Sequence, residues 1–449
     1  MASSKPTSLK YEAIQGEDEV VEVVGLNGIP LSVLNEIKHH KVFITGSLVV
    51  LEASVMWAYF SCLSAQDYYK KAFPSVNFDF LTTPLLTWPL VIGHVLQAGF
   101  HLRISYKNRV AIGYFLFAWA AIVIIAQDFL TLDSTVAAYA VLASFACVGI
   151  AHSVVEPAFY LLAALFPDED STHAVQVGNV SAGVMNIALS TVIRVFVGGF
   201  DLNESQTSVK LSFYIFMGVL LVVCVIALVV FHYLEALPCV KYLLDRADDD
   251  HAKYGDPSPA EVWSKYWRVA KVIMLPMVAQ FMLFFCSLAL FPGVGCASSV
   301  HVLDPSSIPA SWFCSPGIIA SFNIGDFLGR IVCTKAVYSA FSLHACFYIS
   351  LLRWLWLPLL LLGTHSSSLY AFDGIAVVGL YWELILNVLL GFTGGMFSTI
   401  TMGLAPRIVA QEDREAAGSL MVFSLFLGLA VGSTFGYVIG TYHFASIGL

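Results

Sequence analysis

The segment FNIGDFLGR at residues 322–330 places a carboxylate and a guanidinium inside a long apolar stretch of the chain. In a helix, Asp326 and Arg330 lie one turn apart on one face, and Asn323 lies on that face as well. A carboxylate accepts hydrogen bonds from hydroxyl or ring N–H groups, and a guanidinium donates in a planar fork. A structural clamp remains one interpretation of the pair. Three polar groups on one face favour a second interpretation, in which they form a site for a polar substrate.

Further ionisable residues stand in other apolar stretches. Glu156 precedes Pro157 in the middle of one of them, and a proline there kinks a helix and is common where the helix lines a cavity. A glutamate at that depth either carries a proton or is neutralised by a basic residue such as Arg194, and both alternatives stay open. Glu52 is expected to serve packing or to lie at the membrane interface, with a place in the same cavity as the alternative. Trp57 offers a face on which a planar base could stack, although helix packing competes with that role.

The composition places the chain in the membrane class. Of 449 residues, 58% are hydrophobic and 12% charged, and the mean hydropathy is +0.79. A soluble domain has roughly 25% charged residues. The net charge of −9 and the scattered basic residues give no support for a nucleic-acid partner, and the nine cysteines show no metal-binding spacing, so neither a metal nor a cofactor is expected. The polar, acidic first forty residues argue against a cleaved signal peptide.

Stretches of about 20 apolar residues are long enough to cross a bilayer as helices. The chain has eleven of them, so the two termini are expected on opposite sides of the membrane. They lie near residues 42–64, 83–103, 109–129, 136–165, 173–199, 211–235, 270–293, 312–335, 340–363, 375–402 and 415–441.

The distribution of lysine and arginine predicts the orientation, because cytoplasmic loops carry an excess of both. An N-terminus in the cytoplasm puts almost all of these residues inside, and it puts the C-terminus outside. The sequon at Asn203 then lies outside, where glycosylation is possible. Cys296 and Cys314 fall in or beside one external loop, where they are a possible disulfide.

The layout predicts an all-α membrane protein in two bundles. Residues 1–40 form a cytoplasmic tail, 41–236 a six-helix bundle, 237–268 a polar cytoplasmic linker loop, and 269–449 a five-helix bundle. A 6+5 arrangement suggests two bundles that rock about a site at the bilayer midplane. The spans contain no nucleophile–base constellation, so a transporter is favoured over an enzyme.

The glycines and histidines within the spans are expected to have structural roles. The segment GLAVGSTFG, with Gly428, Gly432 and Gly436, repeats the GxxxG spacing of a close helix–helix contact. His94 and His152 stand in apolar helices, where each is expected to be a hydrogen-bonded structural residue rather than a proton relay.

Several separated segments resemble the equilibrative nucleoside transporter family, in the same order along the chain. FNIGDFLGR resembles the family's signature in span 8 and is the most specific of them. The others are EPAFYLLAALFP (156–167), HAVQVGNVSAGVMN (173–186), MLFFCSLALFPGV (282–294) and GLAPRIVAQEDREAAGSLMVFSLFLGLAVGS (403–433).

The resemblance implies an eleven-span, major-facilitator-like carrier of nucleosides, and in some members of nucleobases, that works by alternating access. By motif, Asp326 and Arg330 would bind the sugar hydroxyls, with Asn323 beside them. Around the base, the resemblance implies that Trp57 covers it, Leu429 lines its apolar side, Glu156 reads its edge, and Leu90 lies close by.

Three positions depart from the family pattern. Position 156 is commonly Gln in members selective for nucleosides and is Glu156 here. A carboxylate accepts hydrogen bonds but donates none unless it is protonated. The family's Trp-Asn in span 1 is Trp57-Ala58, and Gly394 stands where span 10 often has Asn. These changes bear on which base is read and on whether ribose is required.

We therefore expect a polytopic carrier of nucleosides, of the purine type, either facilitative or coupled to protons through Glu156. Its partners are the small-molecule substrate, H+ in the coupled case, and the lipid bilayer. The rival within transport is a nucleobase permease that ignores ribose, and the rival outside it is a membrane receptor that binds without carrying. Family habit favours the plasma membrane over an internal membrane.

Overall fold

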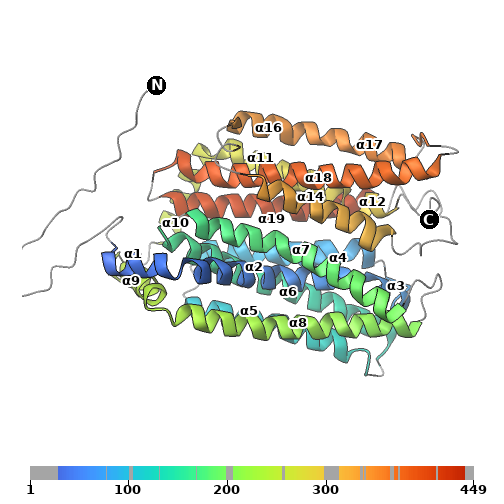
Figure 1. Cartoon of the computed structure of the whole chain (residues 1–449), viewed down its shortest axis with the longest axis horizontal. Coiled ribbons are helices and arrows are strands. Elements are labelled where there is room, and N and C mark those ends of the chain that lie inside the picture. Colours follow the sequence, from blue (N-terminus) through green and yellow to red (C-terminus); the bar gives the residue numbers. More distant parts are fainter. Residues whose placement is uncertain are drawn as a thin grey trace, which may run out of the picture.

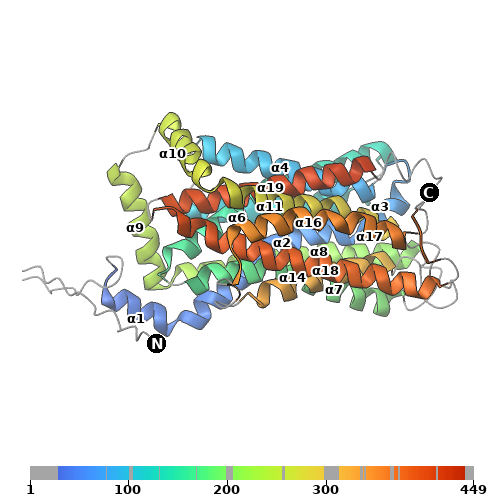
Figure 2. The same cartoon turned by 90° about the horizontal axis from the view of Figure 1, so that it is seen from above.

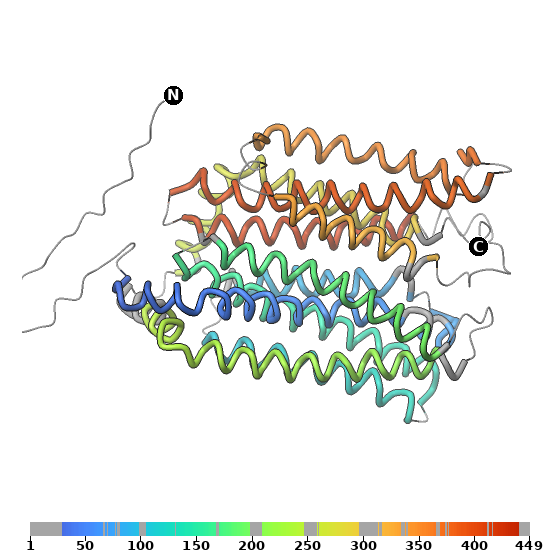
Figure 3. The backbone as a smooth tube through the Cα atoms, viewed as in Figure 1, coloured from blue at the N-terminus to red at the C-terminus, as the bar shows by residue number. Residues whose placement is uncertain are grey.

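The computed structural model describes most of the chain and is all-helical. The described residues are 29–76, 78–100, 105–130, 132–167, 169–198, 206–254, 258–297, 313–333, 337, 340–364, 369–372, 375–410 and 413–439. The long helices run side by side along the longest axis of the molecule (Figures 1 and 3).

Six long helices, which we call the N-terminal set, lie together in one half of the molecule (Figure 1). Two short helices, α1 (Leu31–His39) and α3 (Gln66–Ala72), accompany them. The set comprises α2 (Lys41–Ser64), α4 (Phe78–Phe100), α5 (Tyr106–Ala126), α6 (Ser134–Leu165), α7 (Glu169–Gly198) and α8 (Gln206–Glu235).

The other half holds the C-terminal set, in which several helices are broken into consecutive pieces. A π-helix, η2, leads into α14, and a 3-10 turn, η3, joins α16 to α17. The set comprises α11 (Met274–Leu290), α12 (Gly293–Ala297), η2 (Phe313–Ile319), α14 (Ala320–Ile331), α16 (Leu343–Leu352), η3 (Arg353–Leu355), α17 (Trp356–Gly363), α18 (Ala376–Leu404), η4 (Ala405–Ile408) and α19 (Arg414–Ile439).

Nine segments of the described chain are long and apolar enough to cross a membrane. Each predicted range contains a described helix, but α4 and α14 are not among the nine. In α4, two prolines and several polar side chains dilute the apolar run. In α14, the helix has only 12 residues and contains both Asp326 and Arg330.

Apolar side chains both fill the interior and cover the outside of the bundle. The largest core cluster contains only residues between Ile29 and Leu243, so the N-terminal set has a core of its own. Large apolar side chains such as Phe115, Phe196 and Val225 point outward and are more than half exposed. An apolar exterior is what helices in contact with lipid hydrocarbon require.

The polar segment at 237–268 was expected to be a loop, and that expectation is wrong. It forms α9 (Pro238–Tyr254) and the start of α10 (Pro259–Val272), which lie at one end of the bundle (Figure 2). The Ser258 hydroxyl accepts from the backbone N–H of Glu261, and the Glu261 carboxylate accepts in return from the backbone N–H of Ser258. This capping box, with Pro259 in the first turn, stabilises the beginning of α10.

The glycines of the GLAVGSTFG segment support a close contact between α19 and α11. A Cβ at Gly428 would lie 2.6 Å from the carbonyl oxygen of Phe281, and one at Gly432 would lie 2.6 Å from that of Phe285. Backbones approach this closely only where the side chain is a hydrogen atom. The structural interpretation of this segment is therefore confirmed.

Two expectations concern residues outside the described part. Asn203 is one of them, so its glycosylation stays a prediction. The side chains of Cys296 and Cys314 are not described either, and their disulfide stays a prediction as well. The cysteines whose side chains are described are free thiols.

Candidate functional site

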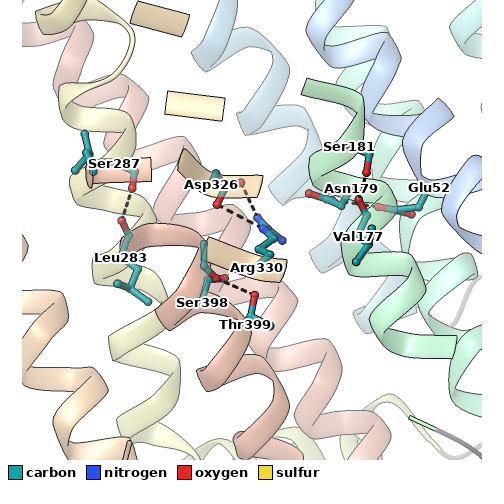
Figure 4. A network of polar contacts seen from close by, with 12 residues as sticks. Glu52, Val177, Asn179, Ser181, Leu283, Ser287, Asp326, Arg330, Ser398 and Thr399 are labelled. Atoms are coloured by element: carbon teal, nitrogen blue, oxygen red, sulfur yellow. Dashed lines mark hydrogen bonds and ion pairs between the residues drawn. The ribbon is translucent and has the colours of Figure 1, made fainter. Parts of the chain in front are cut away.

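The carboxylate and the guanidinium of the FNIGDFLGR segment form the ion pair that their spacing predicts. Arg330 Nη2 lies 3.3 Å from Asp326 Oδ2, and Arg330 Nε lies 3.4 Å from Asp326 Oδ1. Arg330 is buried and Asp326 is half-buried. Figure 4 shows the guanidinium between Asp326 and the polar side chains of α2 and α7. The pair is thus a clamp within its helix that still faces the other half of the molecule.

Glycines on both sides hold α14 directly against α18. A Cβ at Gly325 would lie 2.1 Å from the carbonyl oxygen of Val388, and one at Gly391 would lie 2.1 Å from that of Phe322. Gly329 and Gly395 make equally close approaches one turn further along. The backbone that carries Asp326 and Arg330 therefore packs on another backbone, with almost no side chain in between.

Asn323 meets the N-terminal set across the boundary between the two sets. Its Nδ2 donates to the carbonyl oxygen of Ile319 at 2.8 Å, within its own helix. Its Oδ1 faces Gly183 of α7, where an added Cβ would lie only 2.2 Å away. Gly183 thus leaves room for the Asn323 amide at the contact between α7 and α14.

A second polar cluster joins α2, α6 and α7 inside the N-terminal set. Asn179 Nδ2 donates to Glu52 Oε1 at 3.2 Å and to Glu156 Oε1 at 3.3 Å. Glu156 Oε2 lies 2.7 Å from His152 Nε2, which confirms the hydrogen-bonded role expected for that histidine. Both carboxyl groups are almost completely buried, at 0% exposure for Glu52 and 3% for Glu156.

This cluster corrects two expectations about the glutamates. Packing or an interfacial place was favoured for Glu52, but the structure buries its carboxyl group in the polar cluster. Arg194 was one candidate to neutralise Glu156. It stands fifteen residues beyond Asn179 on α7, which is about 22 Å of helix, and the partners of Glu156 are Asn179 and His152 instead.

Electrostatic interactions link the Asp326–Arg330 pair to the polar cluster of the N-terminal set. The charge of Arg330 acts on Glu156 and on Tyr160, both on α6, and on Glu52 of α2. The C-terminal set therefore contributes a cation and the N-terminal set contributes two carboxyl groups to one region. Both face the boundary along which the two sets meet.

An apolar cluster lies beside the carboxyl groups and brings two of the predicted residues together. Leu90 of α4 is buried and packs with residues of α19, among them Leu429. The rings of His94 and His152 lie edge-on to Phe426 at 5.7 and 6.1 Å. Leu90 and Leu429 are therefore linked to Glu156 through Phe426 and His152.

Trp57 is placed differently from the other predicted residues. It is 7% exposed and packs in the core cluster of the N-terminal set. It shares α2 with Glu52, five residues earlier in the chain. The structure thus supports helix packing for Trp57 and leaves its contact with a substrate as a prediction.

Gly394, one of the departures from the family pattern, lies against a buried arginine. A Cβ at Gly394 would be 3.1 Å from Arg353 Nη2. That guanidinium donates to the carbonyl oxygens of Leu283 and Leu390 and to the hydroxyl of Ser287. A larger residue at position 394 would crowd this network, which stabilises the contacts between α11, α18 and η3.

Sequence reasoning missed Asn179 and undervalued Glu52 and His152. The glycine of the segment QVGNVS marks a position that another helix can approach closely, but it does not indicate which helix. A Cβ at Gly178 would lie 2.5 Å from the carbonyl oxygen of Val49 and 3.0 Å from Glu52 Cβ. Asn179, the next residue, donates to Glu52 at this contact.

Solved transporter structures share this arrangement of helices. The D-xylose–proton symporter matches with a TM-score of 0.59 at 10% identity, over 89% of each chain. A bacterial homologue of the human lysosomal transporter Spinster matches with a TM-score of 0.56 at 15% identity, over 91% of this chain and 83% of that one. The fold is that of the major facilitator transporters, and the chain is a multi-pass membrane transporter rather than an enzyme.

Sequence comparison then gives the family. Residues 142–441 match the family model for nucleoside transporters. Equilibrative nucleotide transporter 1 of Arabidopsis thaliana is 25% identical over 381 residues, 83% of this chain and 80% of that one. Equilibrative nucleoside transporter 4 of Homo sapiens is 32% identical over 170 residues, 38% of this chain and 29% of that one. The chain belongs to the equilibrative nucleoside transporter family, as its motifs predicted.

Proposed function

We propose that this carrier moves nucleosides, with a preference for purines, by alternating access at a site between its two sets of helices. The family supports a nucleoside-type substrate, and the major facilitator fold supports two halves that open alternately. The observation that carries the proposal is the buried Asp326–Arg330 pair, which faces the carboxyl groups of the other set. A donor fork beside an acceptor suits the adjacent hydroxyls of a ribose.

The proposal assigns eleven membrane spans in a 6+5 arrangement, with the N-terminus in the cytoplasm and the C-terminus outside. The six spans are the long helices of the N-terminal set, within residues 41–236. The five are α11, η2 with α14, α16 with α17, α18 and α19, within residues 269–449. Residues 1–40 are the cytoplasmic tail and 237–268 the cytoplasmic connector. The separate core of the N-terminal set supports this division.

Within the site, Asp326 and Arg330 bind the sugar and Asn323 supports them. Glu156 reads the edge of the base. Leu90 and Leu429, which share one apolar cluster, line the face of the base, and Trp57 closes it from α2.

Transport is facilitative or coupled to protons through Glu156, and the carrier works in the plasma membrane. The buried place of Glu156, with a histidine as its neighbour, supports the coupled mode. A pH gradient imposed on vesicles separates the two modes, because only the coupled carrier concentrates substrate in response to it.

The test is uptake of labelled adenosine by the full chain in proteoliposomes, with Asp326→Asn as the variant. We expect the variant to lose adenosine uptake by more than about tenfold, since one lost charge-assisted hydrogen bond costs about 1.5–3 kcal/mol. Gly218→Ala is the control, because a Cβ at Gly218 meets nothing within 4 Å.

Competition and counterflow define the outcomes that would contradict the proposal. If adenine or hypoxanthine displaces the label as well as adenosine does, the carrier is a nucleobase permease and the pair does not read a sugar. If preloaded vesicles bind label but show no counterflow, the protein binds without carrying.

A further inference from the structure

Two carboxyl groups come unusually close together inside the N-terminal set. Glu52 and Glu156 accept hydrogen bonds from one and the same amide nitrogen, that of Asn179. Both carboxyl groups are buried, so this amide donates to two acceptors away from water. Glu52 Oε2 has no hydrogen-bond partner in the part of the chain that the structure describes.

Glu52 and Glu156 accept from one donor, and both are buried. Two negative charges this close together, away from water, repel strongly, and one proton shared between them removes most of that cost. Ionised carboxylates are acceptors only, so the two groups can bond to each other only when one holds a proton. Two buried carboxyl groups around a single donor therefore favour a state with one proton.

The permanent charges around the pair do not neutralise it. From the helices packed around it, the titratable or charged groups that face it are His152 and Tyr160 on α6, His94 on α4, Tyr106 and Tyr114 on α5, and Arg330 on α14. Among these described groups, Arg330 alone has a permanent positive charge, and it is already paired with Asp326. Three carboxyl groups thus face one guanidinium.

We propose that Glu52 and Glu156 share one proton and that this proton sets how Glu156 binds the substrate. The inference rests on the proposed function, in which Glu156 reads the base. A singly protonated pair offers one donor and one acceptor, as the amide of a glutamine does. It thereby supplies at position 156 the hydrogen-bonding capacity that a lone carboxylate lacks.

Within the pair, Glu52 and Asn179 are positioning residues. Asn179 holds the two Oε1 atoms on either side of its Nδ2, and Gly178 allows α2 to bring Glu52 to that place. His152 fixes the second oxygen of Glu156 at 2.7 Å. When the proton leaves at higher pH, the pair loses its donor, and binding of a base that needs a donor and an acceptor weakens.

The functional test compares the pH profiles of nucleoside uptake for the full chain and its variants in proteoliposomes. We expect wild-type uptake to fall as the pH rises. Glu52→Gln removes one of the two carboxyl groups that share the proton, so we expect its decline to shift to lower pH than that of the wild type. Glu156→Gln has a permanent donor and acceptor, and its uptake is independent of pH.

A spectroscopic readout that does not depend on transport accompanies the uptake assay. Infrared spectra in H2O and D2O detect the carbonyl stretch of a protonated carboxyl group. We expect a band in the wild type at neutral pH that shifts or disappears in Glu156→Gln. A second band, from the buried Glu383 carboxyl group that has no hydrogen-bond partner among the described residues, is expected to remain unchanged. Asp128→Asn is the matched control, because Asp128 is a carboxylate outside this cluster, and it leaves both the band and the pH profile unchanged.

Two results would overturn the inference. One is an uptake profile of Glu52→Gln that superimposes on the wild-type profile. The other is a set of protonated-carboxyl bands that is identical in the wild type and in Glu156→Gln. If the wild type carries no nucleoside at all, the proposed function fails, while the infrared band still decides whether the pair holds its proton. If Glu52→Gln does not fold, the band in Glu156→Gln carries the test.

Discussion

The two polar regions of this carrier are built in opposite ways. On the C-terminal side, Asp326 and Arg330 belong to one helix, and glycines allow that helix to pack directly on α18. On the N-terminal side, Glu52, Glu156 and Asn179 come from three helices and are held together by hydrogen bonds between their side chains. The first arrangement is fixed by backbone contact. The second can change its bonding when a proton is added or removed.

The difference suggests a division of labour in substrate recognition. A rigid ion pair suits the part of a nucleoside that is common to the whole class, namely its sugar. An adjustable cluster suits the part that varies, the base. The first three predictions below each disturb one of the two regions, and the last concerns a carboxylate outside both.

The largest effect is expected from breaking the ion pair on one side only. Asp326→Leu leaves the buried Arg330 guanidinium without its counter-charge, which should cost about 4 kcal/mol of stability. The measurement is thermal unfolding of the purified protein in detergent. The double variant Asp326→Leu/Arg330→Met removes both charges and should recover most of the stability but no transport. A single variant as stable as the wild type would show that the pair is not buried as described.

The next largest effect concerns the backbone contact between α14 and α18. Gly391→Ala places a Cβ 2.1 Å from the carbonyl oxygen of Phe322, so the helices must separate, at a cost of about 3 kcal/mol. We expect a lower melting temperature and reduced adenosine uptake. Gly418→Ala, with nothing within 4 Å of the added Cβ, is the matched control. Equal melting temperatures for the two variants would contradict the close contact.

A smaller effect is expected from the amide between the two glutamates. Asn179→Ala removes a donor from two buried carboxyl groups and leaves the oxygens that accepted from it unpaired, and we expect a loss of about 2 kcal/mol. The pH profile of uptake should change more than the melting temperature does. A variant that loses stability but keeps the wild-type pH profile would make Asn179 a purely structural residue.

The smallest effect is expected at Asp128, a carboxylate just beyond the end of α5 and outside both polar regions. Burial raises the pKa of Asp128, but hydrogen bonds from Lys210, Tyr214 and Tyr68 outweigh it, so the pKa lies below its ordinary value. A lowered pKa contributes stability at pH above the ordinary value, and the contribution is lost as the pH falls through the lowered one. Asp128→Asn should cost about 1 kcal/mol at neutral pH. In acid, its melting temperature should converge with that of the wild type.

The sequence predicted the C-terminal polar region better than the N-terminal one, for a physical reason. Asp326, Arg330 and Asn323 share a helix, so a spacing of three and four residues was enough to place them on one face. The contact between Glu52 and Glu156 depends on how α2, α6 and α7 pack, and no local spacing encodes that. Likewise, the length of the apolar stretches predicted where the membrane helices lie. It did not predict α9 and α10, because a hydropathy scan does not distinguish a helix of mixed polarity from a loop.

The helical connector between the two sets has a consequence for how far they can separate. α10 contacts both α4 and α19, and its first residue is fixed by the cap that Ser258 and Glu261 form. A flexible linker adapts its span to any opening, whereas a helix of 14 residues keeps a length of about 21 Å. We therefore expect α10 to act as a strut of fixed length at this end of the molecule and to limit how far the two sets can separate there.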